Sequence, residues 1–275
     1  MNAGKIAIST ALPACLVPLA YVFPFTITLH LAYTGARVTL SLFALSLEAS
    51  PFTIGILLSL LALLPMTFSV PVGRMIDRIG VRKPMLVGAA ALSAGILVAV
   101  ISPTLPALFI TSCLAGSGFI LFHIAVNYLV AVTGQPEDRP RNFSWLAISF
   151  STSGFLGPMV AGFAIDGIGY RRTMLLLACF SLATLLAFFF KRIEVPLQPA
   201  DAPGAPQRRL MDLLHSRTMR RVFIVSGLLS MAWDLFSFVV PIHGSNIHLS
   251  ASTIGLILGT FGGAVFVVRL AMPLV

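Results

Sequence analysis

Two charged side chains lie deep within long apolar stretches of the sequence, Arg37 in the first stretch and Asp234 in the seventh. A charge at bilayer depth costs about 2.5–3.5 kcal/mol on insertion scales, so such residues usually serve a function. The two opposite charges could neutralise each other or meet a charged substrate, and either group could contribute to proton coupling. The alternative for Arg37 is that its long side chain reaches a membrane interface from an overlong helix.

His123 and Asn127 form a second polar pair, one helical turn apart in the fourth apolar stretch. They are weaker candidates for the wall of a substrate cavity. The alternative is ordinary hydrogen bonding between neighbouring helices, which polar side chains often provide inside a membrane.

The apolar stretches contain no His cluster at metal-ligand spacing, no paired carboxylates and no Ser/His/Asp arrangement. The three cysteines, Cys15, Cys113 and Cys179, lie in apolar sequence without CxxC or Cys/His spacing, and we expect them to be small packing residues. We therefore expect no enzyme activity, no metal and no cofactor.

The composition indicates that these stretches cross a membrane. Hydrophobic residues make up 57% of the chain and charged residues 10%, whereas soluble domains are about half apolar and about a quarter charged. The formal net charge of +9 is not accompanied by a basic stripe interleaved with aromatic residues, so the lipid bilayer rather than nucleic acid is the expected partner. The apolar run after Lys5 continues far past Cys15, which predicts a retained first helix and not a cleaved signal peptide.

Eight stretches are long enough to span a bilayer, at about 14–46, 52–75, 84–102, 106–132, 143–165, 172–190, 222–243 and 251–273. The first would reach about 45–50 Å as a helix, which requires tilt, a kink near Pro24 or protrusion from the bilayer. Splitting it into two spans is the competing interpretation, and this would invert the topology of everything downstream.

The distribution of Lys and Arg predicts a cytoplasmic amino terminus. With one span at 14–46, fifteen of the eighteen basic residues fall on the cytoplasmic side, as the positive-inside rule requires. These are Lys5, four residues from Arg74 to Lys83, Arg139, Arg141, seven from Lys191 to Arg221, and Arg269.

Residues 193–220 are polar and rich in proline, which predicts a cytoplasmic linker with a short surface helix at about 208–219. The linker separates an N-terminal six-helix bundle over 1–192 from the start of a second bundle over 221–275, as in transporters built from two related halves. An internal repeat supports this division, because residues 50–58 and 250–258 share five of nine residues and each opens the second span of its half.

The loop after the second stretch combines glycines that permit a tight turn with an acid at a helix boundary and a basic cluster: Gly73, Arg74, Asp77, Arg78, Gly80, Arg82 and Lys83. A charged turn that only fixes topology is the alternative.

The pattern of this loop resembles the signature between helices two and three of the major facilitator superfamily, with Val81 where a basic residue is usual. The resemblance covers the whole chain and implies an all-α membrane bundle, a six-helix half plus two helices of a second half. It also implies that Asp77 holds the outward-facing state closed on the cytoplasmic side.

Small residues and a proline recur in the fifth stretch, at Gly154, Gly157, Pro158 and Gly162, and this spacing lets helices pack backbone to backbone. The pattern also resembles the fifth-helix motif of proton-coupled exporters of the superfamily, with Ser153 and Ala161 in place of two glycines. Ser112 stands where many such exporters carry an arginine in helix four, so proton coupling would need another group. The similar Gly-rich loop at residues 165–172 is assigned no transport role.

The resemblance implies a secondary active transporter of a bacterial inner membrane that moves a small solute by alternating access. Proton-coupled efflux is favoured, and the alternatives are a solute importer of the same superfamily or a transport-inactive truncated protein. We expect a small-molecule substrate, protons as the coupling ion and a monomer.

The chain ends where the repeat predicts a counterpart of the Gly73 loop, so we expect helices nine to twelve to be missing and residues 1–275 alone not to catalyse transport. The fold does not specify the substrate.

Overall fold

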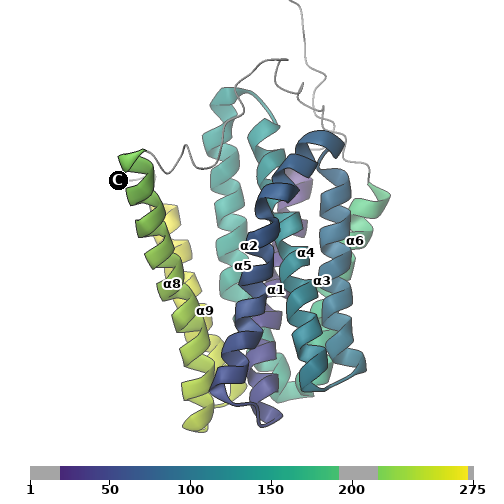
Figure 1. Cartoon of the computed structure of the whole chain (residues 1–275), viewed down its shortest axis with the longest axis vertical. Helices are drawn as coiled ribbons and strands as arrows, with labels where there is room; N and C mark the ends of the chain where they lie inside the picture. The colour runs from purple at the N-terminus through teal and green to yellow at the C-terminus, as the bar shows by residue number, and fades with distance from the viewer. Residues whose placement is uncertain (1–18, 192–215, 272–275) are drawn as a thin grey trace, which may run out of the picture.

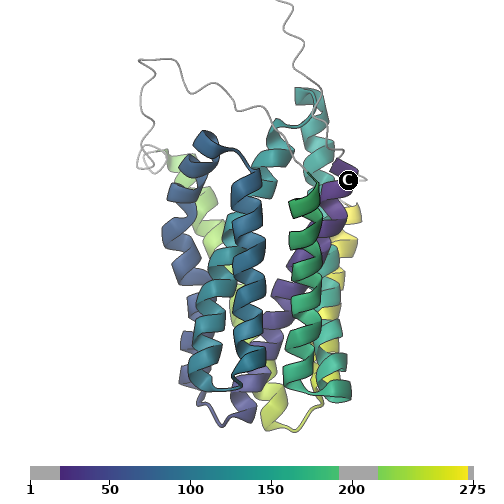
Figure 2. The same cartoon turned by 90° about the vertical axis from the view of Figure 1, so that its right-hand side faces the viewer.

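A computed structural model describes residues 19–191 and 216–271 of the chain. Every regular element in the described part is helical, and the long helices run side by side along one axis (Figures 1 and 2). The elements are α1 (Leu19–Ser46), α2 (Pro51–Ile79), α3 (Arg82–Ile101), α4 (Leu105–Val132), a 3₁₀ turn (Pro136–Asp138), α5 (Arg139–Ile168), α6 (Tyr170–Phe190), α8 (Arg217–Asn246) and α9 (Ala251–Ala271).

The eight long helices correspond to the eight predicted spans, and the expected all-α membrane fold is confirmed. In the described part, seven helices are long and apolar enough to cross a membrane. The eighth, α1, is also long enough to cross a bilayer, and it carries Arg37. Residues 19–46 form one continuous helix that passes through Pro24, so the structure does not show the alternative of two spans.

Most of the predicted linker, including residues 208–215 of the predicted surface helix, lies outside the described residues, as does Cys15. Residues 217–219 form the first turn of α8, which begins five residues before the predicted span at 222. Cys113 is half-buried, but Cys179 is exposed, so the expectation of a packing role is wrong for Cys179.

The turns that precede α2 and α9 have the same backbone geometry, 200 residues apart. Glu48 has a φ of 60° and His248 a φ of 59°, in the left-handed region that residues other than glycine seldom adopt. In both turns the next serine then caps the helix, with the amide of Thr53 or Thr253 donating to the Oγ of Ser50 or Ser250 at 3.2 Å. The sequence repeat therefore corresponds to a structural repeat of two helices joined by one turn.

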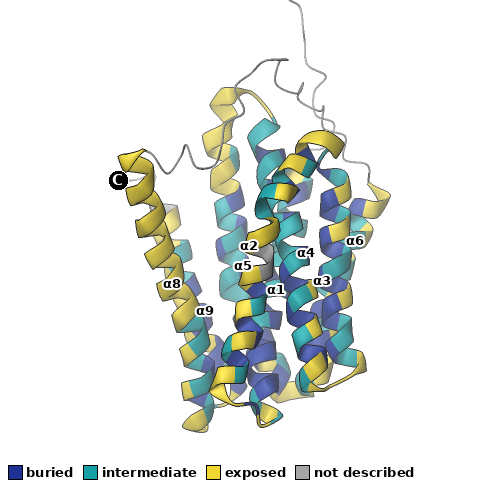
Figure 3. Ribbon diagram, viewed as in Figure 1, coloured by how far each residue is buried: buried dark blue, intermediate teal, exposed yellow. Residues whose placement is uncertain are grey.

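Helices α1 to α6 share a continuous apolar core, and α9 packs along α5 beside it. The bundle has a Glu48 end, where α1 meets α2, and an opposite Asp77 end, where α2 meets α3. α8 lies against α1 and α2 at the Glu48 end and diverges from them toward the Asp77 end (Figure 1). Its residues 217–235 are correspondingly exposed, and its buried and half-buried residues lie in the remainder of the helix (Figure 3).

Candidate functional site

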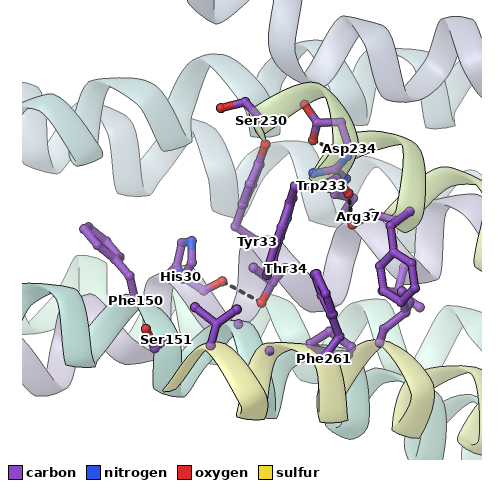
Figure 4. Close-up of a pocket in the computed structure, with 18 of the residues that line it drawn as sticks. His30, Tyr33, Thr34, Arg37, Phe150, Ser151, Ser230, Trp233, Asp234 and Phe261 are labelled. Atoms are coloured by element: carbon purple, nitrogen blue, oxygen red, sulfur yellow. Dashed lines mark hydrogen bonds and ion pairs between the residues drawn. The ribbon is translucent and has the colours of Figure 1, made fainter. Parts of the chain in front are cut away.

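A cavity of about 650 Å³ lies between α1, α5, α8 and α9 (Figure 4). This volume is within the range of small-molecule sites. Its wall is mainly apolar and aromatic, and its polar groups converge from all four helices. The lining residues are His30, Tyr33, Thr34, Arg37 and Val38 of α1; Phe150, Ser151, Gly154 and Pro158 of α5; Leu229, Ser230, Ala232, Trp233, Asp234, Phe236 and Ser237 of α8; and Leu258, Phe261, Gly262, Val265 and Arg269 of α9.

An ion pair joins the two charged residues that the sequence places in the first and seventh spans. Nη2 of Arg37 lies 2.7 Å from Oδ1 of Asp234, and the side chains are 20% and 52% exposed. Arg37 therefore points into the cavity wall and does not reach for an interface, as the alternative interpretation supposed. A nearby opposite charge offsets part of the cost of holding either charge away from water, whereas removing one partner leaves the other uncompensated.

A second arginine of the cavity wall, Arg269 of α9, has a different environment. Its Nη1 donates to the carbonyl oxygen of Ala147 at 2.9 Å and to Oγ of Ser151 at 2.8 Å, both on α5. The sequence predicts Arg269 on the cytoplasmic side of the membrane but not as part of a cavity, and the structure places it in the last turn of α9, in the wall of this cavity. No feature of the sequence distinguishes it from an ordinary basic residue at a helix end.

His30 is a cavity residue that the sequence analysis missed. Its Nδ1 lies 2.8 Å from Oγ of Ser153, and the same hydroxyl donates to the carbonyl of Ser149 at 2.6 Å. Because the hydroxyl proton is used on Ser149, Ser153 accepts from Nδ1–H of His30, which leaves Nε2 as the basic nitrogen of the neutral ring. The spacing in the sequence could have indicated this role. His30 precedes Arg37 by seven residues, which places both side chains on the same face of the helix, two turns apart.

His123 and Asn127 are not among the residues that line the cavity. The His123 ring stacks on Phe150 with centroids 4.7 Å apart, and its Nδ1 is buried without a hydrogen-bond partner in the described structure. The Asn127 amide donates to the carbonyl of His123 at 2.8 Å, within its own helix. The helices of the cavity wall are α1, α5, α8 and α9, so the structure places this pair of α4 outside the wall.

The small residues of α5 contact two different helices. A Cβ on Gly157 would collide with Thr34 Oγ1 and lie 3.0 Å from the carbonyl oxygen of Leu31, both on α1. On the other side, a Cβ on Gly162 would collide with the carbonyl of Ala251, and α9 approaches so closely that a Cβ on Gly262 would lie 2.7 Å from the carbonyl oxygen of Gly154. The glycines thus allow α1 and α9 to pack on opposite sides of α5.

The Asp77 loop is a tight turn at one end of the bundle. Gly80 ends α2 with a φ of 76°, and its amide donates to the carbonyl of Ile76 at 2.9 Å. Arg74, Asp77, Arg78 and Lys83 are exposed, while Arg82 donates to the carbonyl of Phe189 at 3.3 Å. Within residues 19–191 and 216–271, the Asp77 carboxylate has no ion-pair partner, since the ion pair found among these residues joins Arg37 and Asp234.

Asp166, at the Glu48 end, joins α5 to the start of α9. Its Oδ1 accepts from the amide of Ala251 at 3.1 Å, and its Oδ2 accepts from the amide of Ser252 at 2.8 Å. These amides are donors without partners inside the helix, and a carboxylate also complements the positive end of the helix dipole. Sequence reasoning gave this loop no transport role, and its contact with α9 was not predicted.

The Major Facilitator Superfamily profile matches residues 22–275 of the chain. The tetracycline resistance protein, class B, of Escherichia coli is 29% identical over 136 residues, which are 50% of this chain and 33% of that protein. The inner membrane transport protein YajR of Escherichia coli (strain K12) is 33% identical over 115 residues, 42% of this chain and 24% of that protein.

Solved structures resemble the fold at lower sequence identity. The peptide transporter POT in complex with sulfate superimposes with a TM-score of 0.58 at 20% identity, covering 81% of this chain and 46% of that one. A POT family transporter in complex with a thioalcohol-conjugated peptide also gives 0.58, at 19% identity, and covers 86% of this chain and 48% of its own. The matched segments thus span about a third or less of the curated relatives and about half of the solved chains.

Proposed function

Because the chain belongs to the major facilitator superfamily, a family of carriers and not of enzymes, we propose that it forms part of a secondary transporter that moves a small solute by alternating access. The observation that carries this proposal is the cavity, which is walled by α1 and α5 on one side and by α8 and α9 on the other and contains the Arg37–Asp234 ion pair in its wall. The chain is a multi-pass membrane protein, and we assign it to a bacterial inner membrane with residues 1–192 and 221–275 as its two bundles.

We place the Asp77 end of the bundle in the cytoplasm. The exposed residues Arg74, Arg78 and Lys83 gather there, in accord with the positive-inside rule. The divergence of α8 toward this end then corresponds to a cavity accessible from the cytoplasm (Figure 1).

The Glu48 end is closed by contacts between α1, α5 and α9. Val38, Leu42, Ile165, Ile254 and Leu258 belong to one buried apolar cluster there. Asp166 adds its two hydrogen bonds to the first turn of α9. In the proposed cycle these contacts must break when the cavity opens to the outside, so Asp166 acts as a latch for the inward-open state.

We propose export, with proton coupling, as the direction of transport. The α5 motif supports this direction, and the tetracycline resistance protein is a similar sequence. Asp234 is the acid of the cavity wall, and protonation would remove the charge that pairs with Arg37. Proton binding would therefore be linked to the contact between α1 and α8, which is the kind of differential interaction that coupling requires.

Flux measurements in everted vesicles containing the complete transporter test this function, with solutes first selected by thermal-shift screening and proton release followed by a pH-sensitive dye. Asp234→Asn and Arg37→Gln should each lower coupled flux at least tenfold, because each leaves an uncompensated charge or a severed contact. The charge exchange, Arg37→Asp with Asp234→Arg, should restore part of the loss. Arg220→Gln, at an exposed position of α8, is the control. Undiminished coupled flux in both single variants would contradict the proposal.

A further inference from the structure

The charges of the cavity wall do not balance. Among the described lining residues, three belong to the charged types Arg, Lys, Asp and Glu: Arg37, Arg269 and Asp234. The carboxylate of Asp234 already lies 2.7 Å from the guanidinium of Arg37. The contacts recorded for Arg269 are to a carbonyl and a hydroxyl oxygen, which are neutral. The described wall therefore carries one positive charge without a counter-ion.

The guanidinium of Arg269 has donors to spare. Both of its recorded hydrogen bonds use Nη1, and the described residues provide no recorded acceptor for Nη2 or Nε. An arginine presents its donors in a planar fork that matches the two oxygens of a carboxylate or the oxygens of a sulfonate. The contacts with α5 hold one side of the fork in place, which reduces the entropy lost when a ligand binds to the rest.

Arg269 belongs to the last turn of α9, where its exposed side chain forms part of the cavity wall. Its partners on α5, Ala147 and Ser151, are four and eight residues past the start of the span predicted at 143–165, which is about 6 and 12 Å along the helix axis. An ion pair beside a mainly apolar cavity wall is stronger than in bulk water, because the effective dielectric constant is lower there. An anionic group on the substrate would supply the missing partner.

The remainder of the wall is suited to an apolar body. The rings of Trp233 and Phe261 lie 5.0 Å apart between centroids, and Phe150 and Tyr33 line the same cavity (Figure 4). Aromatic walls with a few placed polar groups are typical of sites for small organic molecules.

We propose that Arg269 forms an anion-binding subsite and that the substrate is an organic anion with an aromatic or apolar body. This proposal rests on the cavity being the transport site, and it adds the chemical class of the substrate. Arg269 binds the anionic group at the Asp77 side of the cavity, while the body of the substrate lies against Trp233 and Phe261.

Quenching of Trp233 fluorescence tests this subsite directly. The chain has two tryptophans, so the 275-residue chain carrying Trp145→Phe reports on Trp233 alone. In dodecyl maltoside it is titrated with 4-nitrobenzoate and with 4-nitrobenzylammonium, two quenchers of similar size and opposite charge. Arg269→Gln should raise the Kd of 4-nitrobenzoate at least tenfold and should not weaken binding of the cation. Arg269→Lys should retain the preference for the anion, and Arg269→Glu should reverse it.

Arg220→Gln serves as the matched control, because it removes the same charge from an exposed position outside the cavity, and it should leave both titrations unchanged. Equal weakening of both quenchers by Arg269→Gln would assign Arg269 a role only in holding α9 to α5 and would overturn the subsite. An unchanged Kd for 4-nitrobenzoate, or no saturable quenching in the parent chain, would overturn it as well. These results would leave the transport proposal standing, since that depends on the flux of the Arg37 and Asp234 variants.

Discussion

Ser153 and Gly157 of α5 show how two positions of one small-residue motif make different contacts with α1. Ser153 stands where the exporter motif has a glycine, and its hydroxyl accepts from Nδ1 of His30, which a glycine could not do. Gly157, one turn further along, lies so close to α1 that even a methyl group would meet Thr34 and the backbone at Leu31. Ser153 thus makes a polar contact with α1, whereas position 157 has no room for any side chain.

Gly157→Ala should destabilise the protein by about 1–3 kcal/mol, because a close-packed contact does not absorb an added methyl group without moving α1. Unfolding in detergent, followed by circular dichroism, measures the change. Gly154→Ala provides the comparison on the same helix, since a Cβ there would meet nothing within 4 Å. That control should show no loss, because alanine is the better helix former. Equal stabilities of the two variants would contradict the assigned packing role of Gly157.

Between elements, the Glu48 and Asp77 ends of the bundle are held in different ways. At the Glu48 end, α5 and α9 are joined through the Asp166 carboxylate and the buried cluster around Ile165. At the Asp77 end, residues 217–235 of α8 are exposed. At the Asp77 end α8 can therefore stand apart from α1, while at the Glu48 end α5 and α9 remain in contact. This is the geometry that a rocking motion of two bundles needs.

Asp166→Ala should weaken closure at the Glu48 end. Loss of a helix cap and of its interaction with the dipole is worth about 1 kcal/mol, which corresponds to about a fivefold change in a conformational equilibrium. The measurement is the rate at which an impermeant thiol reagent, added from the Glu48 side, modifies Ser230→Cys in a background without native cysteines. The rate should rise about fivefold with Asp166→Ala.

The control for this labelling is Glu48→Ala, which removes another exposed acid from the same end of the bundle. It should leave the rate unchanged, because no recorded hydrogen bond or ion pair of the Glu48 side chain joins it to α9 in the described structure. A rate that does not respond to Asp166→Ala, or that responds equally to Glu48→Ala, would remove the latch from the proposed cycle.

For the whole molecule, the orientation in the membrane determines what the cavity does. The proposed topology places the Asp77 loop in the cytoplasm and the turn at Glu48 outside. The repeat of that turn at His248 places the starts of α2 and α9 on the same side. An inverted molecule would present the same cavity to the opposite compartment, and the proposed direction of access would be reversed.

Labelling of intact cells with an impermeant maleimide tests this orientation, again without native cysteines. Glu48→Cys and Arg172→Cys should react from outside, whereas Arg78→Cys should react only after permeabilisation, because the basic loop is expected in the cytoplasm. Reaction of Arg78→Cys from outside, with Glu48→Cys protected, would reverse the topology and the direction of access inferred from it.

The sequence by itself determined the helices, because runs of about twenty apolar residues depend only on local composition, and the placement of Lys and Arg predicted their topology. It also predicted the family and the repeat at residues 50–58 and 250–258, since these are patterns of residues in order. The structure added the shared turn geometry at Glu48 and His248.

Only the tertiary structure decided which polar residues meet. Arg37 and Asp234 are 197 positions apart, and nothing in the sequence marks Arg269 as a residue of the cavity wall. The physical reason is that lipid and protein interior are similarly apolar, so a membrane helix is hydrophobic all round and its sequence does not reveal the face that it turns inward. That face is set by close packing at residues such as Gly157 and Gly162, and with it the positions of His30, Arg37 and Arg269 in the cavity wall.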